Sequence, residues 1–200
     1  MKTAAIVALL GLALPAGPDR ADGHLIAGAS AFRAGRFDVA LVEFRVAQKL
    51  GAVDAAAYAA AALVKLGRPE EAVDAFGPAQ TRPSDPLLDY YRAMACYGAR
   101  LYHCAARLLA GVAAQGGPGM SEQAAQTRTA IAAILRAAPS TETIDWYLAR
   151  CTGAEASHHP RLAAANCAEA IELASRRPDA YGRTRATEGL SQAQRKGAGR

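Results

Sequence analysis

FRAGRFDVALVEFRVAQKLG, residues 32–51, is the stretch that decides the fold of this chain. After a turn signal at Gly35, its apolar residues follow helical spacing, at Phe37, Ala40, Phe44 and Ala47. Residues at this spacing share one face of an α-helix. The stretch therefore predicts an amphipathic helix whose buried face alternates large and small side chains.

The same offsets recur in two later stretches, residues 63–79 and 98–112. The spacing from Ala40 to Ala72 is 32 residues, and that from Ala72 to Ala105 is 33. A unit of this length is typical of stacked helical hairpins, each of which buries its apolar face against the next. The matching residues are Ala72, Phe76 and Ala79 in the first stretch, and Tyr102, Ala105, Leu109 and Val112 in the second.

With these residues, the segment 24–114 resembles an array of tetratricopeptide repeats. That family packs a small residue of each first helix against an alanine of the second. The resemblance implies an all-α superhelix of about four to five hairpins. An irregular alanine-rich bundle is the alternative. The small residues expected on the first helices are Gly28, Ala60 and Ala93. The alanines expected opposite them on the second helices are Ala40, Ala72 and Ala105.

In that family the first helix of each hairpin lines a concave groove that receives a peptide or a partner helix. The resemblance implies the same groove here, with two cations and three apolar or aromatic side chains suited to an acidic, partly hydrophobic protein segment. Leu25 and Ala29 stand where carboxylate-clamp members carry Lys and Asn, so a clamp is not expected. The groove candidates are Arg33, Lys65, Tyr90, Met94 and Tyr97.

Beyond the regular repeats, residues 120–196 are expected to form divergent helical hairpins and a C-terminal capping helix. Gly111–Met120 is the expected boundary between the two parts, and Ser121 is a candidate cap for the first divergent helix. The composition agrees with helices throughout. Of 200 residues, 52% are hydrophobic but only 6% are aromatic, and alanine supplies most of the apolar content.

The amino terminus, MKTAAIVALLGLALPA at residues 1–16, has the form of a secretory signal peptide. Lys2 precedes an apolar run from Ala4 to Leu14, which is too short to span a bilayer. Cleavage is expected after Ala16, although sites up to residue 23 fit as well, and a buried amino-terminal helix is the alternative. The mature protein is therefore expected to be periplasmic or secreted, with no membrane span.

Export changes how the four cysteines are interpreted, because an oxidising compartment favours disulfides. Four cysteines allow three connectivities. Each of two local pairs flanks a turn or loop, so pairing of Cys96 with Cys104 and of Cys151 with Cys167 is expected. Four unbridged, small apolar core residues are the alternative.

No cluster of catalytic or metal-binding residue types stands at a diagnostic spacing, so the chain is expected to be non-enzymatic, with no cofactor and no metal. An alternative is an envelope enzyme with a pocket in the divergent half. That pocket would use Asp145, Trp146, Tyr147, His158 and His159.

Residues 176–200 carry the whole net charge of +5, so the first 175 residues are neutral overall. Residues 176–200 hold seven Lys and Arg residues against Asp179 and Glu188. A polyanion-binding module is therefore a second alternative. A solvated terminal helix is the favoured explanation of this charge, and nucleic acid is not the expected partner. The favoured hypothesis is a protein-binding scaffold of the bacterial cell envelope.

We expect the exported protein to lack residues 1–16 when it is expressed with its own amino terminus in a Gram-negative host. The signal sequence directs translocation, and cleavage follows the apolar run. Intact mass after thiol alkylation without reductant measures both the amino terminus and the number of free thiols. A full-length chain would contradict the expected export.

Overall fold

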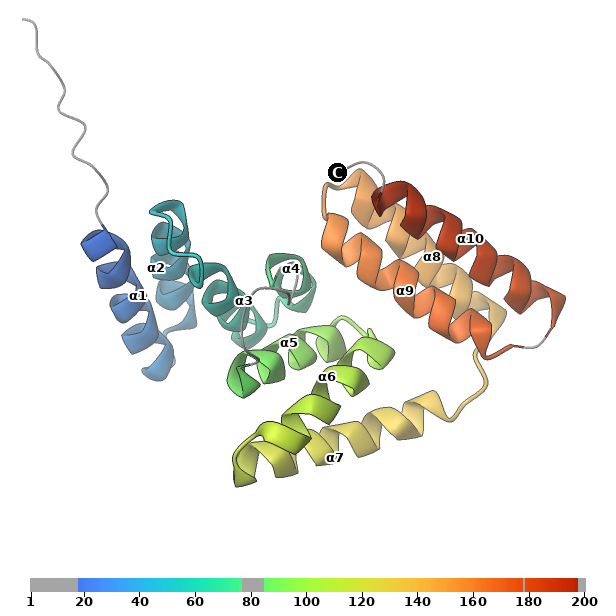
Figure 1. The fold of residues 1–200 in the computed structure, drawn as a ribbon, viewed down its shortest axis with the longest axis horizontal. Coiled ribbons are helices and arrows are strands. Elements are labelled where there is room, and N and C mark those ends of the chain that lie inside the picture. The colour runs from blue at the N-terminus through green and yellow to red at the C-terminus, as the bar shows by residue number, and fades with distance from the viewer. Residues whose placement is uncertain (1–17, 77–84, 178, 198–200) are drawn as a thin grey trace, which may run out of the picture.

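A computed structural model describes residues 18–76, 85–177 and 179–197 of the chain, with side chains from Arg20 to Gln192 outside the gaps. The leader expected at 1–16 and Ala79 lie outside these residues. The described chain forms ten α-helices and no strand (Figure 1). They are α1 Pro18–Arg33, α2 Phe37–Lys49, α3 Ala55–Lys65, α4 Pro69–Ala75, α5 Pro86–Gly98, α6 Tyr102–Gln115, α7 Pro118–Leu135, α8 Thr141–Ala156, α9 Pro160–Ser175 and α10 Ala180–Gly197.

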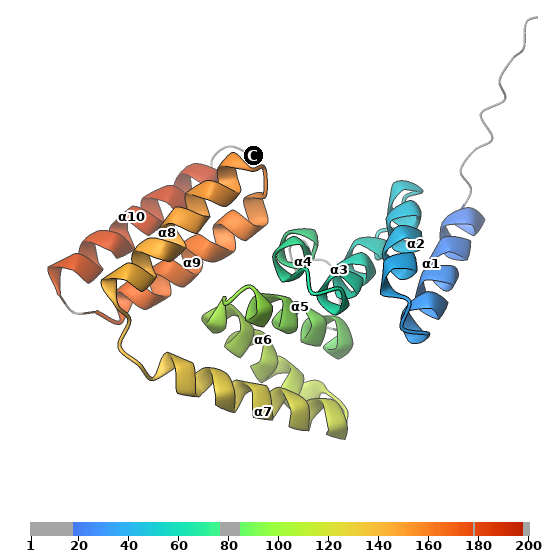
Figure 2. The ribbon, with the colours of Figure 1, turned by 180° about the vertical axis from the view of Figure 1, so that it is seen from behind.

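The first six helices form three hairpins, α1–α2, α3–α4 and α5–α6, which stack in chain order, and α7 packs against α6. The prediction of an all-α helical-repeat superhelix is confirmed. From behind, the chain turns away at the end of α7 before α8 begins (Figure 2). Helices α8, α9 and α10 then pack against one another as a separate layer.

Two helices begin earlier in the chain than the sequence predicts, and the sequential stacking extends further. Helix α1 begins at Pro18, before the expected start at residue 24, and α7 begins at Pro118 rather than at Ser121. The Ser121 hydroxyl instead donates to the carbonyl of Gly116. Because α6 and α7 pack together across the segment Gly111–Met120, sequential stacking ends later, after α7.

Small side chains allow the paired helices to approach closely. The three second-helix alanines, Ala40, Ala72 and Ala105, are fully buried. Gly28 on α1 contacts Phe44 on α2, and a Cβ at Gly28 would lie 2.6 Å from the Phe44 ring. The large side chain of one helix therefore fills the space that the missing side chain of the other leaves.

The turns between paired helices repeat as well. Gly35, Gly67 and Arg100 occupy equivalent positions and have φ values of 73°, 71° and 65°. At each turn the amide of the following residue donates to a carbonyl five residues back, as from Arg36 to Ala31. Glycine adopts this left-handed backbone freely, whereas Arg100 does so at a conformational cost.

A fourth hairpin, α8–α9, has the same turn. His158 has a φ of 60°, and the His159 amide donates to the Ala154 carbonyl. Counted from this turn, Cys151 stands where Gly28 stands in the first hairpin, and Cys167 stands where Phe44 does. A disulfide thus replaces the glycine–phenylalanine contact, and His158 takes the place of the glycine at the turn.

Both expected disulfides are present, which confirms the local pairing and excludes four unbridged cysteines. Cys96–Cys104 links α5 to α6 with the Cα atoms 6.0 Å apart. Cys151–Cys167 links α8 to α9 with the Cα atoms 5.2 Å apart. Each bond closes a short loop within one hairpin and restricts its unfolded chain.

We expect Gly28→Ala to lower the free energy of unfolding by about 1–3 kcal/mol, because the new methyl group would overlap the buried Phe44 ring. Gly23→Ala, on the same helix, is the matched control because a Cβ there meets nothing within 4 Å. The control should raise stability by roughly 0.5–1 kcal/mol through helix propensity. Urea unfolding measures both changes, and equal shifts would contradict the packing argument.

Candidate binding groove and helix junction

A concave apolar hollow lies on the face formed by α1, α3 and α5, the first helices of the three hairpins. Its volume is about 240 Å³. Phe44 reaches it from α2, past the side of α1 where Gly28 has no side chain. The lining residues are Ala29, Phe32, Arg33, Phe44, Tyr58, Ala61, Leu87, Leu88 and Tyr91.

Aromatic rings form the walls of this hollow. The rings of Phe32 and Tyr91 meet edge to face with centroids 5.6 Å apart, and those of Phe44 and Tyr58 lie 5.5 Å apart. Leu87 is 49% exposed at the edge. An exposed concave site walled by aromatic and aliphatic groups is suited to bury an apolar side chain of a partner.

Two cations stand at the rim. Arg33 lines the hollow at the end of α1, and Lys65 ends α3 with its Nζ 5.6 Å from the centroid of the Tyr91 ring. Burial raises the pKa of Tyr91, and the neighbouring Tyr90 adds to the shift. The Tyr91 hydroxyl therefore remains protonated at neutral pH and is able to donate a hydrogen bond.

The expected groove residues divide into two groups. Arg33 lines the hollow and Lys65 lies over the ring of its lining residue Tyr91. The other three, Tyr90, Met94 and Tyr97, are half-buried and do not line it. Tyr90 and Tyr97 pack instead against the core of the third hairpin and the α8–α10 layer.

Sequence reasoning missed the aromatic wall of Phe32, Tyr58 and Tyr91. A signal for part of it was present, since Ile26, Tyr58 and Tyr91 follow one another at intervals of 32 and 33 residues. These intervals equal those of the buried alanines, so the three residues occupy one position of the repeat.

On the opposite side of the hairpins, α9 packs against both α4 and α6. Asp74 of α4 lies at the first turn of α9, where its Oδ1 accepts from the amides of Arg161 at 3.1 Å and Leu162 at 3.4 Å. Its Oδ2 is 3.3 Å from Nδ1 of His159. Asp74 thus caps α9 from another helix, because His159 at the N-cap position makes no such bond.

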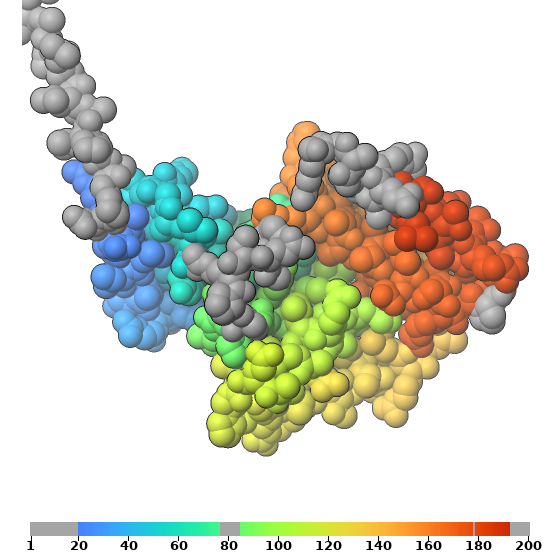
Figure 3. Space-filling view, in the orientation of Figure 1, coloured from blue at the N-terminus to red at the C-terminus, as the bar shows by residue number. Residues whose placement is uncertain are grey.

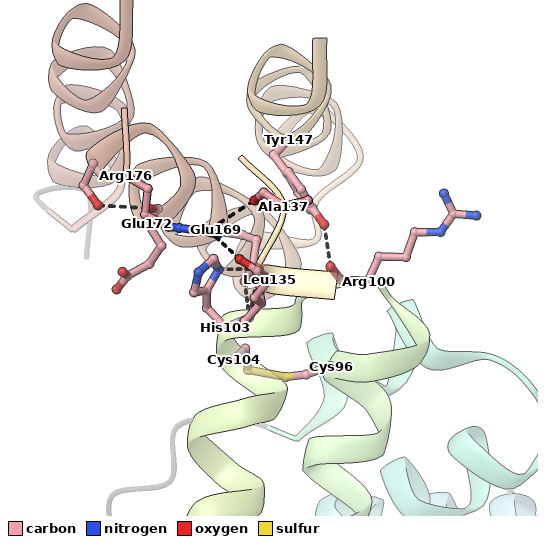
Figure 4. Close-up of polar contacts among 11 residues, drawn as sticks. Cys96, Arg100, His103, Cys104, Leu135, Ala137, Tyr147, Glu169, Glu172 and Arg176 are labelled. Carbon is pink, nitrogen blue, oxygen red and sulfur yellow. Dashed lines mark hydrogen bonds and ion pairs between the residues drawn. A yellow bond between two sulfur atoms is a disulfide. The ribbon is translucent and has the colours of Figure 1, made fainter. Parts of the chain in front are cut away.

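Glu169 of α9 performs the reciprocal role at α6 (Figure 4). Its carboxylate accepts from the His103 amide at 2.9 Å, and Oε1 lies 2.8 Å from Nδ1 of the same residue. The Leu101 side chain, at the N-cap position of α6, supplies no cap. Glu169 is only 2% exposed, so this buried carboxylate depends on His103 and on the helix terminus for its stabilisation.

Two further contacts join the layers at this junction (Figure 4). The Tyr147 hydroxyl on α8 donates to the carbonyl of Arg100, the residue at the left-handed turn. Arg176 donates to the carbonyls of Leu135 and Ala137 and so satisfies the end of α7. The junction therefore combines polar contacts to backbone groups with an apolar core that α5, α6 and α7 share with α8 and α9.

The residues of the alternative enzyme pocket do not converge. Asp145 pairs with Arg185 at 3.1 Å, and Tyr147 is buried with its hydroxyl engaged. His158 and His159 follow the opposite end of α8. The five residues line neither the hollow among α1, α3 and α5 nor the one formed by residues 136–139 and 176–179.

Three of the seven basic residues at the carboxyl-terminal end make contacts within the chain, whereas the side chains of Arg195, Lys196 and Arg200 lie outside the described part. Arg176 binds carbonyls, and Arg177 pairs with Asp179 at 2.6 Å. Arg185 pairs with Asp145 and with Glu188. The guanidinium groups of Arg176, Arg177 and Arg185 therefore take part in contacts within the fold.

Within the described residues, no group of three or more His, Cys, Asp or Glu side chains is placed to hold a metal ion. None of the described helices is long and apolar enough to cross a membrane. Comparison of the chain with family models, curated proteins and solved structures gives no match.

We expect the stability of the fold to decline as the pH rises above about 10. Burial raises the pKa of Tyr147 well above its usual value, and the nearby carboxylate of Glu169 adds to the shift. The native state therefore holds this proton after the unfolded chain has released it, so the stabilisation present at lower pH is lost as the pH rises.

Tyr147→Phe removes this contribution and should give a flatter profile between pH about 10 and 12. It should also cost about 1 kcal/mol at neutral pH, because the hydrogen bond to Arg100 is lost. Urea unfolding at several pH values measures both effects. If stability falls with pH in the same way in the wild type and in Tyr147→Phe, Tyr147 is not the group responsible for the decline.

Proposed function

We propose that this chain is a non-enzymatic scaffold of tetratricopeptide type, which binds a protein or peptide segment in the groove of α1, α3 and α5. The observation that carries the proposal is the aromatic hollow with Arg33 and Lys65 at its rim. Each of the three successive hairpins contributes to its lining. Such a surface favours a bulky apolar side chain that is flanked by carboxylates.

We place this function in the bacterial cell envelope, in the periplasm or outside the cell. Two disulfides support this assignment, because such bonds persist in oxidising compartments and are rare in the cytosol of most organisms. The signal-peptide pattern of residues 1–16 supports it independently. The scaffold would present its groove to partners after export.

The test uses a synthetic peptide in which one phenylalanine stands between pairs of glutamates. We expect the protein to bind it and Tyr91→Ala to weaken binding about tenfold, because one wall of the hollow is lost. Arg33→Glu should weaken binding of this peptide by a similar factor and strengthen binding of a matched lysine peptide.

Arg107→Glu is the matched control, since Arg107 is exposed on α6 and does not line the hollow. Fluorescence anisotropy of the labelled peptide measures each affinity. If the control weakens binding as much as Arg33→Glu does, general charge attraction explains the binding and the groove does not.

A further inference from the structure

We propose that α9 is a strut that fixes the angle between the second and third hairpins and thereby sets the width of the groove on the opposite face. This inference rests on the proposed function, because it assigns a control element to the same site. No residue of α9 lines the hollow.

The position of α9 is the first argument. It packs against α4, the second helix of hairpin two, and against α6, the second helix of hairpin three. The α8–α10 layer thus bridges two consecutive hairpins. In the space-filling view this layer stands apart from α1 and α2, so it leaves the first hairpin unbridged (Figure 3).

The two contacts that secure the strut are directional. Asp74 extends from α4 to the amides at the start of α9, and Glu169 extends from α9 to the amide at the start of α6. Each carboxylate accepts backbone bonds at a helix terminus, where the helix dipole favours negative charge. A rotation of one hairpin against the other would break at least one of these sets of bonds.

The connection to the groove runs through the hairpins. Hairpin three is rigid, because Cys96–Cys104 links α5 to α6 and the buried Ala93 and Ala105 belong to the same core. In hairpin two, Ala60 and Ala72 share a core in the same way. A fixed distance between α4 and α6 therefore fixes the distance between Tyr58 on α3 and Tyr91 on α5, which form facing parts of the hollow.

The experiment compares Glu169→Gln and Asp74→Asn with Glu172→Gln. Both test variants retain side-chain shape and remove the charge that caps a helix. Glu172 is the matched control, because it is exposed on the same helix as Glu169. Spin labels are attached at Val53→Cys, in the turn that leads into α3 of hairpin two, and at Ala114→Cys on α6 of hairpin three, both exposed positions. The native cysteines are bridged and do not take the label.

We expect both test variants to broaden the distribution of distances between the labels and the control to match the wild type. The glutamate–phenylalanine peptide should bind the test variants about tenfold more weakly, because part of its binding energy must then order the groove. If Glu169→Gln does not fold, Asp74→Asn carries the test, since Asp74 is partly exposed.

If the distance distributions of the test variants coincide with that of the wild type, α9 does not fix the angle between the hairpins and the proposal is wrong. Broadened distributions with unchanged peptide affinity would show a bridge that does not control the groove, and would also overturn the proposal. If the distributions broaden but the wild type binds no peptide, the proposed function fails while the bridging role of α9 is upheld.

Discussion

The contact of the buried Glu169 carboxylate with His103 is the interaction on which the arrangement of the two layers depends. A carboxylate that is 2% exposed is costly unless it is fully engaged. Here the amide and ring of His103 and the positive end of α6 engage it. Because these partners belong to the third hairpin, α9 is stable in this position only when it lies against that hairpin.

Asp74 makes the complementary contact at the start of α9. Together the two carboxylates supply caps that the N-cap residues Leu101 and His159 do not supply. The amino-terminal ends of α6 and α9 are thus each capped by a residue from another hairpin. The layers are joined by satisfied backbone groups, and apolar contacts such as those of Tyr147 in the shared core add to this.

Four hairpins with one turn geometry make up most of the chain, and their internal contacts differ in chemistry. Gly28 and Phe44 fill the space between the first two helices by shape, whereas Cys151 and Cys167 fill the equivalent space with a covalent bond. The fourth hairpin leaves the regular stack. Its second helix packs against α4 and α6, the second helices of hairpins two and three, whereas the apolar hollow lies among the first helices, α1, α3 and α5.

The sequence by itself determined the helices, the repeat and the local disulfide pairing, because these depend on spacing within one hairpin. It also named Arg33, which lines the hollow, and Lys65, which lies over the Tyr91 ring. It named Tyr90 where the structure uses Tyr91, because one residue turns a helix by about 100° and a repeat alignment does not fix that rotation. Only the tertiary structure decided the departure of α8 from the stack and the capping by Asp74 and Glu169. Those bonds join residues from 66 to 88 positions apart, and no local pattern records which distant carboxylate satisfies an uncapped helix.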